Sequence, residues 1–137
     1  MILHPAVVVH GIDHVRTALR PGRPITLLSA PGAALFAGCM WWRGLIGQGL
    51  AEFPLAEPLD VLDCADASGQ AMAALRIGQR LLVLDAACPA FAAVNAAASM
   101  LGAMVLTFRP PALDLAELGG ARRLCMWLRG DRTGPLG

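Results

Sequence analysis

The side chains of this sequence that could do chemistry stand mostly at the ends of short apolar runs. His10, Ser29, Asp63, Asp85 and Arg109 each follow directly after such a run. Imidazoles and carboxylates move protons, and a guanidinium holds an anion through paired hydrogen bonds. If the runs are parallel strands, their carboxyl ends meet at one edge of a sheet. The sequence therefore predicts a site for a small anionic ligand at that edge.

Asp85 and Arg109 occupy matching positions, because each follows a glycine, Gly78 or Gly102, by the same number of residues. In this register the guanidinium would fix an anionic substrate, while Asp85 and Asp63 orient it or move a proton. The alternative interpretation is an ion pair that only satisfies the edge of the sheet.

A second group of polar residues comes shortly after Asp63. Asp66, Ser68 and Gly69 lie in a turn that leads into an expected helix over residues 66–77. Backbone N–H groups at a helix start can hold a phosphate or a carboxylate, so this turn is a second candidate part of the anion site. Alternatively, Asp66 or Ser68 simply caps the helix.

The turn from Ser29 to Gly32 leads into another expected helix and completes the set of ligand-binding candidates. Its sequence lacks the lysine and the spacing of a Walker loop, and nothing in the chain matches the dinucleotide motif G-x-G-x-x-G. A plain strand-to-helix turn is favoured here. We therefore expect no bound cofactor.

The segment from His10 to His14 holds two imidazoles and the carboxylate of Asp13. A metal site would need both rings on one helix, where residues four apart share a face. His10 instead ends a strand, so we expect no metal site and slightly favour general acid–base work. The simpler account is that Asp13 caps a helix.

Apolar runs and turn residues predict the elements that would position these groups. Strands are expected at residues 6–9, 25–29, 59–62, 81–84 and 104–108, and helices at about 13–19, 33–53, 66–77 and 89–101. Residues 112–118 could form a short helix, and residues 123–128 either a sixth strand or a packed helix. The predicted fold is a three-layer α/β domain with a mainly parallel sheet of five strands, or six, and helices on both faces.

This order of elements resembles that of flavodoxin-like, Rossmann-like and receiver-type domains. The receiver resemblance would make Asp63 the phospho-acceptor. That family also needs acidic residues after the first strand and a lysine after the fifth, where this chain has His10 and Arg109. In composition the chain resembles small bacterial α/β proteins rich in arginine and alanine, a resemblance that implies no activity.

Length and composition indicate one domain with a large core. The chain has 137 residues, of which 56% are hydrophobic and 15% charged, so residues 1–129 are expected to form the domain and residues 130–137 a flexible tail. A formal charge of +1 gives no reason to expect a nucleic-acid partner. All 11 basic residues are arginine and tyrosine is absent, which excludes lysine Schiff-base chemistry and phenolic acids.

Residues 89–108 carry no charge and are long enough to cross a bilayer, but their composition changes from alanine-rich to β-branched, so we expect no membrane span. The amino terminus lacks the pattern of a secretory signal, and the four cysteines form no C-x-x-C pair. We therefore expect a cytoplasmic protein with reduced thiols.

Trp41 and Trp42 are neighbours on an expected helix and point about 100° apart. One of them would stay exposed at the surface when the other is buried in the core, and an exposed tryptophan is a good contact for a homo-oligomer. Packing of both in the core is the alternative. Two functions therefore stay open, namely binding of a small anionic metabolite and a non-catalytic, homo-oligomeric interaction module.

Overall fold

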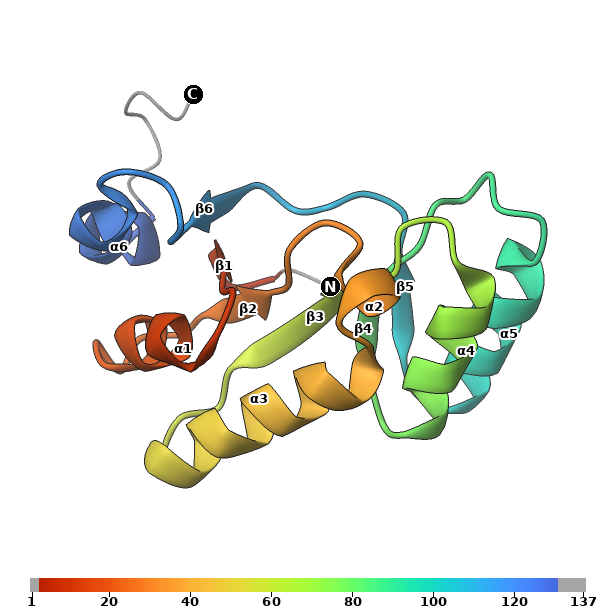
Figure 1. Cartoon of the computed structure of the whole chain (residues 1–137), viewed down its shortest axis with the longest axis horizontal. Helices are drawn as coiled ribbons and strands as arrows, with labels where there is room; N and C mark the ends of the chain where they lie inside the picture. Colours follow the sequence, from red (N-terminus) through yellow and green to blue (C-terminus); the bar gives the residue numbers. More distant parts are fainter. Residues whose placement is uncertain (1–2, 131–137) are drawn as a thin grey trace.

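Strands and helices alternate along the chain in the computed structural model, which describes residues 3–130 (Figure 1). The strands are β1 (Ala6–Val8), β2 (Thr26–Leu28), β3 (Leu59–Asp63), β4 (Leu81–Val83), β5 (Met104–Leu106) and β6 (Ala112–Asp114). The helices are α1 (Ile12–Leu19), α2 (Ala33–Phe36), α3 (Cys39–Glu52), α4 (Ser68–Arg76), α5 (Phe91–Met100) and α6 (Gly120–Leu128). Within these residues the strands form one all-parallel sheet in the order β5-β4-β3-β2-β1-β6. The predicted α/β, Rossmann-like fold is confirmed.

The sixth strand is formed by a segment whose sequence had suggested a short helix. Residues 112–118 contribute β6, which pairs in parallel with β1 so that Val7 lies opposite Leu113 and Val8 lies opposite Asp114. The short-helix prediction is wrong because this segment completes the edge of the sheet beside β1. Its pairing partner is more than 100 residues away in the sequence, so no local pattern reveals it.

Residues 123–128 belong to α6, which resolves the choice between strand and helix. Leu124, Trp127 and Leu128 recur at helical spacing and are all buried. The indole Nε1 of Trp127 also donates a hydrogen bond of 2.8 Å to the carbonyl oxygen of Ala6. This bond fastens the helix to β1.

Side chains alternate between the two faces of the sheet, and each face has its own core cluster. Val7 and Leu27 belong to the larger cluster, together with the buried side chains of the helices. Val8 and Leu28 belong to the smaller cluster, which is made of strand residues and Leu3. We call these two sides the helix face and the back face. In the described residues the buried helical side chains all lie on the helix face, whereas the sequence had suggested helices on both.

The strand order explains this distribution. From β1 to β5 each strand is laid down beside the previous one in the same direction, so right-handed crossovers keep α1, α3, α4 and α5 on one side. The chain must then return from β5 to β6 at the opposite edge of the sheet. Figure 1 shows this return as an extended connection without a helix.

The expected helix over residues 33–53 is divided into α2 and α3. The break falls at Gly38, which has a φ of 88°. This left-handed conformation interrupts helical geometry and is readily adopted by glycine. The long apolar run concealed the break, because both pieces bury apolar side chains against the same core.

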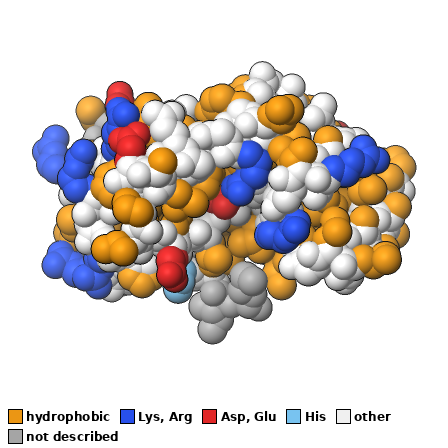
Figure 2. Space-filling model, turned by 90° about the horizontal axis from the view of Figure 1, so that it is seen from below, with side chains coloured by type: hydrophobic (Ala, Val, Ile, Leu, Met, Phe, Trp, Pro, Cys, Tyr) orange, Lys and Arg blue, Asp and Glu red, His pale blue; other side chains and the backbone are white. Residues whose placement is uncertain are grey.

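Residues 89–108, the uncharged segment that is long enough to cross a bilayer, are divided between α5 and β5. Within residues 3–130, no helix has the length and apolar character needed to cross a bilayer. On the face shown in Figure 2, hydrophobic side chains are widespread, and basic ones lie in several separate places. The predicted tail comprises residues 130–137, and of these, residues 131–137 lie outside the described residues.

Candidate functional site

Arg109 links the carboxyl ends of two neighbouring strands. Its Nη1 donates one hydrogen bond of 2.7 Å to Oδ2 of Asp63, at the end of β3, and one of 3.0 Å to the carbonyl oxygen of Ser29, just after β2. The Asp63 side chain is only 5% exposed. The backbone N–H of Asp63 in turn donates to Oγ of Ser29 at 2.9 Å. The three residues therefore form one hydrogen-bonded unit at the edge of the sheet.

Part of the Arg109 guanidinium is left without a partner. A guanidinium carries five N–H donors, of which Nη1 supplies two. Within the described residues, Nε and Nη2 make no hydrogen bond, and 27% of the side chain is exposed. The Nε–Nη2 edge is a planar fork that matches a carboxylate or a phosphate. Asp63 and Ser29 thus hold the guanidinium in place while one edge stays open.

The local sequence explains how Arg109 reaches this position. It lies in the connection between β5 and β6 and is followed by Pro110 and Pro111. A residue before proline is confined mainly to extended conformations, and proline cannot continue a helix. The connection is therefore extended where it passes the ends of β3 and β2.

The turn after β3 contains a strained backbone position. Ala65 has a φ of 51°, and it is the one non-glycine residue with a positive φ in the described chain. Its N–H donates to Oδ1 of Asp63 at 2.8 Å, and its carbonyl oxygen accepts the N–H of Asp85 at 2.8 Å. Gly32, itself left-handed, packs nearby, because a Cβ there would lie 3.8 Å from that of Ala65. These contacts hold the loops after β2, β3 and β4 together.

A second polar cluster lies where β1 and β6 end. Oδ1 of Asp114 lies 2.8 Å from Nε2 of His10. The backbone N–H of His10 donates to Nδ1 of His14 at 3.1 Å, and the two rings meet edge to face with centroids 5.4 Å apart. Asp13 does not cap α1: Gly11 is the N-cap, and Asp13 pairs with Arg16.

The surroundings lower the pKa of two members of this cluster. Burial lowers the pKa of His14, and the neighbouring charge of His10 lowers it further. Burial alone would raise the pKa of Asp114, but a hydrogen bond from the N–H of Ala116 and the bond with His10 outweigh it, and the result is a lowered pKa. Near neutral pH, His14 is therefore neutral and Asp114 is ionised.

Both clusters lie on the same side of the sheet. Asp114 pairs with Val8, which points to the back face. Asp63 lies two residues after Val61, which belongs to the same back-face cluster. Paired residues of parallel strands point to the same face, so Asp63 and Asp114 share both the face and the edge.

Three of the predicted site residues, Ser29, Asp63 and Arg109, are in direct contact in the structure. His10 lies on the same edge, beside β6. Asp85 does not pair with Arg109: it is exposed, and its Oδ1 accepts the N–H of Ala87.

Asp66, Ser68 and Gly69 lie at the start of α4, as expected. Neither Asp66 nor Ser68 caps the helix, because the N-cap residue is Ala67 and no side-chain capping bond is present. The capping interpretation is therefore wrong. Asp66 and Gly69 are exposed, so this turn remains accessible beside the loop of Asp63.

Asp114 is the site residue that sequence reasoning missed. Two turn-prone glycines, Gly119 and Gly120, follow Asp114 and are the sequence signal that an element ends nearby. In the structure Gly120 packs against the backbone at the end of β6. A Cβ on Gly120 would lie 2.6 Å from the carbonyl oxygen of Asp114. Glycine is therefore required for α6 to begin so close to the strand.

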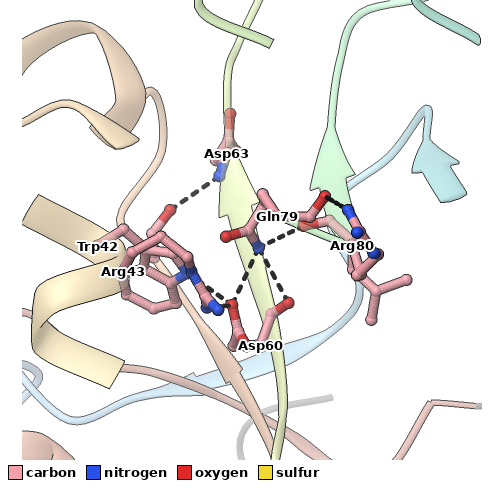
Figure 3. Close-up of polar contacts among 8 residues, drawn as sticks. Trp42, Arg43, Asp60, Asp63, Gln79 and Arg80 are labelled. Atoms are coloured by element: carbon pink, nitrogen blue, oxygen red, sulfur yellow. Dashed lines mark hydrogen bonds and ion pairs between the residues drawn. The ribbon is translucent and has the colours of Figure 1, made fainter. Parts of the chain in front are cut away.

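A third polar network, also missed, lies at the opposite end of β3 (Figure 3). Oδ2 of Asp60 accepts hydrogen bonds from Nε1 of Trp42 and Nε2 of Gln79, each at 2.9 Å, and pairs with Arg43. Gln79 is fully buried and also donates to the carbonyl oxygen of Leu81. This network fastens α3 and the turn before β4 to β3.

The two adjacent tryptophans have different environments. Trp42 is fully buried and bonded to Asp60, so it is unavailable as a surface contact. Trp41 is 37% exposed. Of the two interface candidates, only Trp41 is accessible at the surface.

The structure also contains cavities at the amino-terminal edge of the sheet. One of about 600 Å³ is lined by the ends of α1 and α3 and the segment from Phe53 to Pro58. A smaller one of about 260 Å³ lies between Asp60, Arg80 and Met104. Both lie away from Arg109 and His10.

No model of a known protein family matches the chain, and no curated protein is significantly similar to it.

Proposed function

We propose that the protein binds a small anionic metabolite at the carboxyl edge of its sheet, with Arg109 as the main anchor. The observation that carries this proposal is the open Nε–Nη2 edge of a guanidinium whose Nη1 is already fixed by Asp63 and Ser29. A donor pair held in advance loses little conformational entropy on binding, which favours affinity for a small ligand.

The strand order supports the same edge. In open parallel sheets, ligands bind beyond the carboxyl ends of the strands where the chain reverses its direction of travel across the sheet. Here that reversal separates β1 from β6. His10 and Asp114 flank it, and Arg109 is anchored at the end of the adjacent strand, β2.

A thermal-shift screen with phosphate, acetate and pyruvate at constant ionic strength tests the proposal. An anion at ten times its Kd stabilises the folded state by about 1.4 kcal/mol. For a domain of this size that corresponds to roughly 3–6 °C in Tm. Chloride serves as the reference anion.

Arg109→Lys is the informative variant, because lysine keeps the charge but lacks the planar fork. We expect the anion-dependent rise in Tm to disappear in Arg109→Lys and to persist in Arg122→Lys, which alters an exposed arginine of α6. The proposal is wrong if no anion stabilises the parent, or if Arg109→Lys responds as the parent does.

A homo-oligomeric interaction function is the second candidate. Its motivation is a short segment of exposed apolar side chains, in which Leu35 is 51%, Phe36 72%, Met40 77% and Trp41 37% exposed. Exposed apolar side chains gathered in one patch are typical of interaction surfaces.

Sedimentation velocity tests this second candidate. A dimer in the parent that is lost in Trp41→Glu but kept in Leu118→Glu would support it, because Leu118 is 99% exposed in another part of the fold. A parent that stays monomeric at high concentration would contradict it.

A further inference from the structure

We propose that His10, His14 and Asp114 form a proton-transfer site that acts on a small 2-oxo acid whose carboxylate is held by Arg109. This inference rests on the proposed anion site for its substrate class. The proton-transfer groups themselves belong to separate elements, β6 and the segment from the end of β1 into α1.

The contact between Asp114 and His10 creates an oriented base. An ionised carboxylate only accepts hydrogen bonds, so the 2.8 Å contact assigns the proton of neutral His10 to Nε2. Nδ1 of His10 then carries the free lone pair, and it has no hydrogen-bond partner in the described chain. Asp114 also stabilises the imidazolium that forms when Nδ1 takes up a proton.

His14 supplies the complementary donor. Its Nδ1 accepts the backbone N–H of His10, so the neutral ring carries its proton on Nε2. That N–H donates to no other group within residues 3–130, and the ring that carries it is fixed at the start of α1. A neutral imidazole is a suitable electrophile for a carbonyl oxygen that gains negative charge.

The position of the cluster relative to Arg109 suits a small substrate. The N–H of Val9 donates to the carbonyl oxygen of Leu28, so His10 and Ser29 lie at adjacent strand ends. Neighbouring strands are about 4.8 Å apart, which places the guanidinium bound to Ser29 within roughly 10 Å of the His10 backbone. A molecule with a carboxylate and an adjacent carbonyl is small enough to lie between two groups this close.

The residues present favour one reaction class. The chain has no lysine, so a lysine Schiff base with the carbonyl is excluded. An oriented base and a neutral donor are sufficient to remove a proton from the carbon next to a carbonyl. The C–H bond breaks, its proton passes to Nδ1 of His10, and the electron pair moves onto the carbonyl oxygen, which accepts the N–H of His14. Return of a proton to carbon restores the substrate.

Hydrogen exchange tests this step directly. The full chain is incubated with pyruvate in D₂O, and loss of the methyl signal is followed by ¹H NMR. The enolate takes up deuterium from solvent, so the parent should accelerate the loss. His10→Gln retains an amide donor near the Nε2 position that faces Asp114 but has no base at Nδ1. We expect at least a tenfold slower exchange in this variant, with the Tm rise on pyruvate binding unchanged.

Two further variants separate a positioning role from a structural one. His4→Gln alters an exposed histidine at the opposite edge and should exchange as the parent does. Asp114→Asn should slow the exchange several-fold while the Tm rise on pyruvate binding persists, because the amide can no longer stabilise the imidazolium that forms on His10. Loss of the Tm rise together with the exchange would contradict the positioning role of Asp114.

The outcomes distinguish the two proposals. If pyruvate raises the Tm of the parent through Arg109 but its methyl protons exchange no faster than with His10→Gln, the proton-transfer proposal is wrong and the anion site stands. If the parent neither binds pyruvate nor accelerates exchange, both are wrong for this substrate class. Exchange that depends on His10 and is lost in Arg109→Lys supports both.

Discussion

Arg109 and Asp63 lie 46 residues apart in the sequence, yet Nη1 of Arg109 is 2.7 Å from Oδ2 of Asp63. The contact joins the return connection between β5 and β6 to the end of β3. Because Asp63 is almost fully buried and Arg109 is partly exposed, the pair is both a structural anchor and an accessible cation. Substitutions of Asp63 therefore test stability, whereas Arg109→Lys tests the proposed anion binding.

Asp63→Ala is predicted to lower the free energy of unfolding by about 2–4 kcal/mol, because it removes a buried partner of Arg109 and the acceptor of the Ala65 N–H. Urea denaturation followed by circular dichroism measures the change. Asp85→Ala removes an exposed carboxylate from the next strand end and should stay within about 0.5 kcal/mol of the parent. Equal effects of the two substitutions would contradict the ranking.

Ala65→Gly is predicted to raise the free energy of unfolding by about 0.5–1 kcal/mol. The left-handed conformation of Ala65 costs an alanine about 1 kcal/mol, and glycine adopts it without a Cβ clash. Part of this gain is offset by the greater freedom of glycine in the unfolded chain. Ala96→Gly, an exposed site within α5, should instead lower stability by about 1 kcal/mol. Thermal and urea unfolding of both variants decide the matter.

Two glycines of α3 are predicted to respond in opposite ways to alanine. A Cβ on Gly49 would lie 2.6 Å from Cγ1 of Val15, so Gly49→Ala must displace α1 and should cost about 1–2 kcal/mol. A Cβ on Gly47 meets nothing within 4 Å, and Gly47→Ala should stabilise the helix by about 0.5–1 kcal/mol. If Gly49→Ala were as stable as Gly47→Ala, the close packing of α1 on α3 would be refuted.

Stability is predicted to fall as the pH drops below about 6.5, the ordinary pKa of histidine. The lowered pKa of His14 means that the folded state takes up a proton less readily than the unfolded chain, so protonation favours unfolding. His10, Asp114 and Asp13 are the titratable groups that act on it. The lowered pKa of Asp114 adds a further loss at lower pH, as its carboxylate becomes protonated.

His14→Asn tests the histidine part of this dependence. Asparagine places an acceptor near the position of Nδ1 but does not titrate. The fall in unfolding free energy between pH 7.5 and 5.5 should therefore be smaller in His14→Asn than in the parent, as measured by urea denaturation at each pH. An unchanged fall in His14→Asn would exclude His14 as its source.

The sequence by itself determined the alternation of strands and helices. Runs such as Val7–Val9 and Leu81–Leu84 carry β-branched or aliphatic residues without polar interruption, as strands buried on both faces do. The alternation implied a parallel sheet, and the parallel sheet placed His10, Asp63 and Arg109 at one edge. These properties depend on local composition and on short connections, which a sequence displays directly.

Only the tertiary structure decided which of these residues meet. Arg109 could have paired with Asp85 or Asp63, and the choice depends on how the return connection crosses the sheet. Asp114 lies beside His10 because residues 112–114, whose local sequence had suggested a helix, pair with β1 as strand β6. Strand order and register follow from packing between segments far apart in the chain, and no local pattern records them.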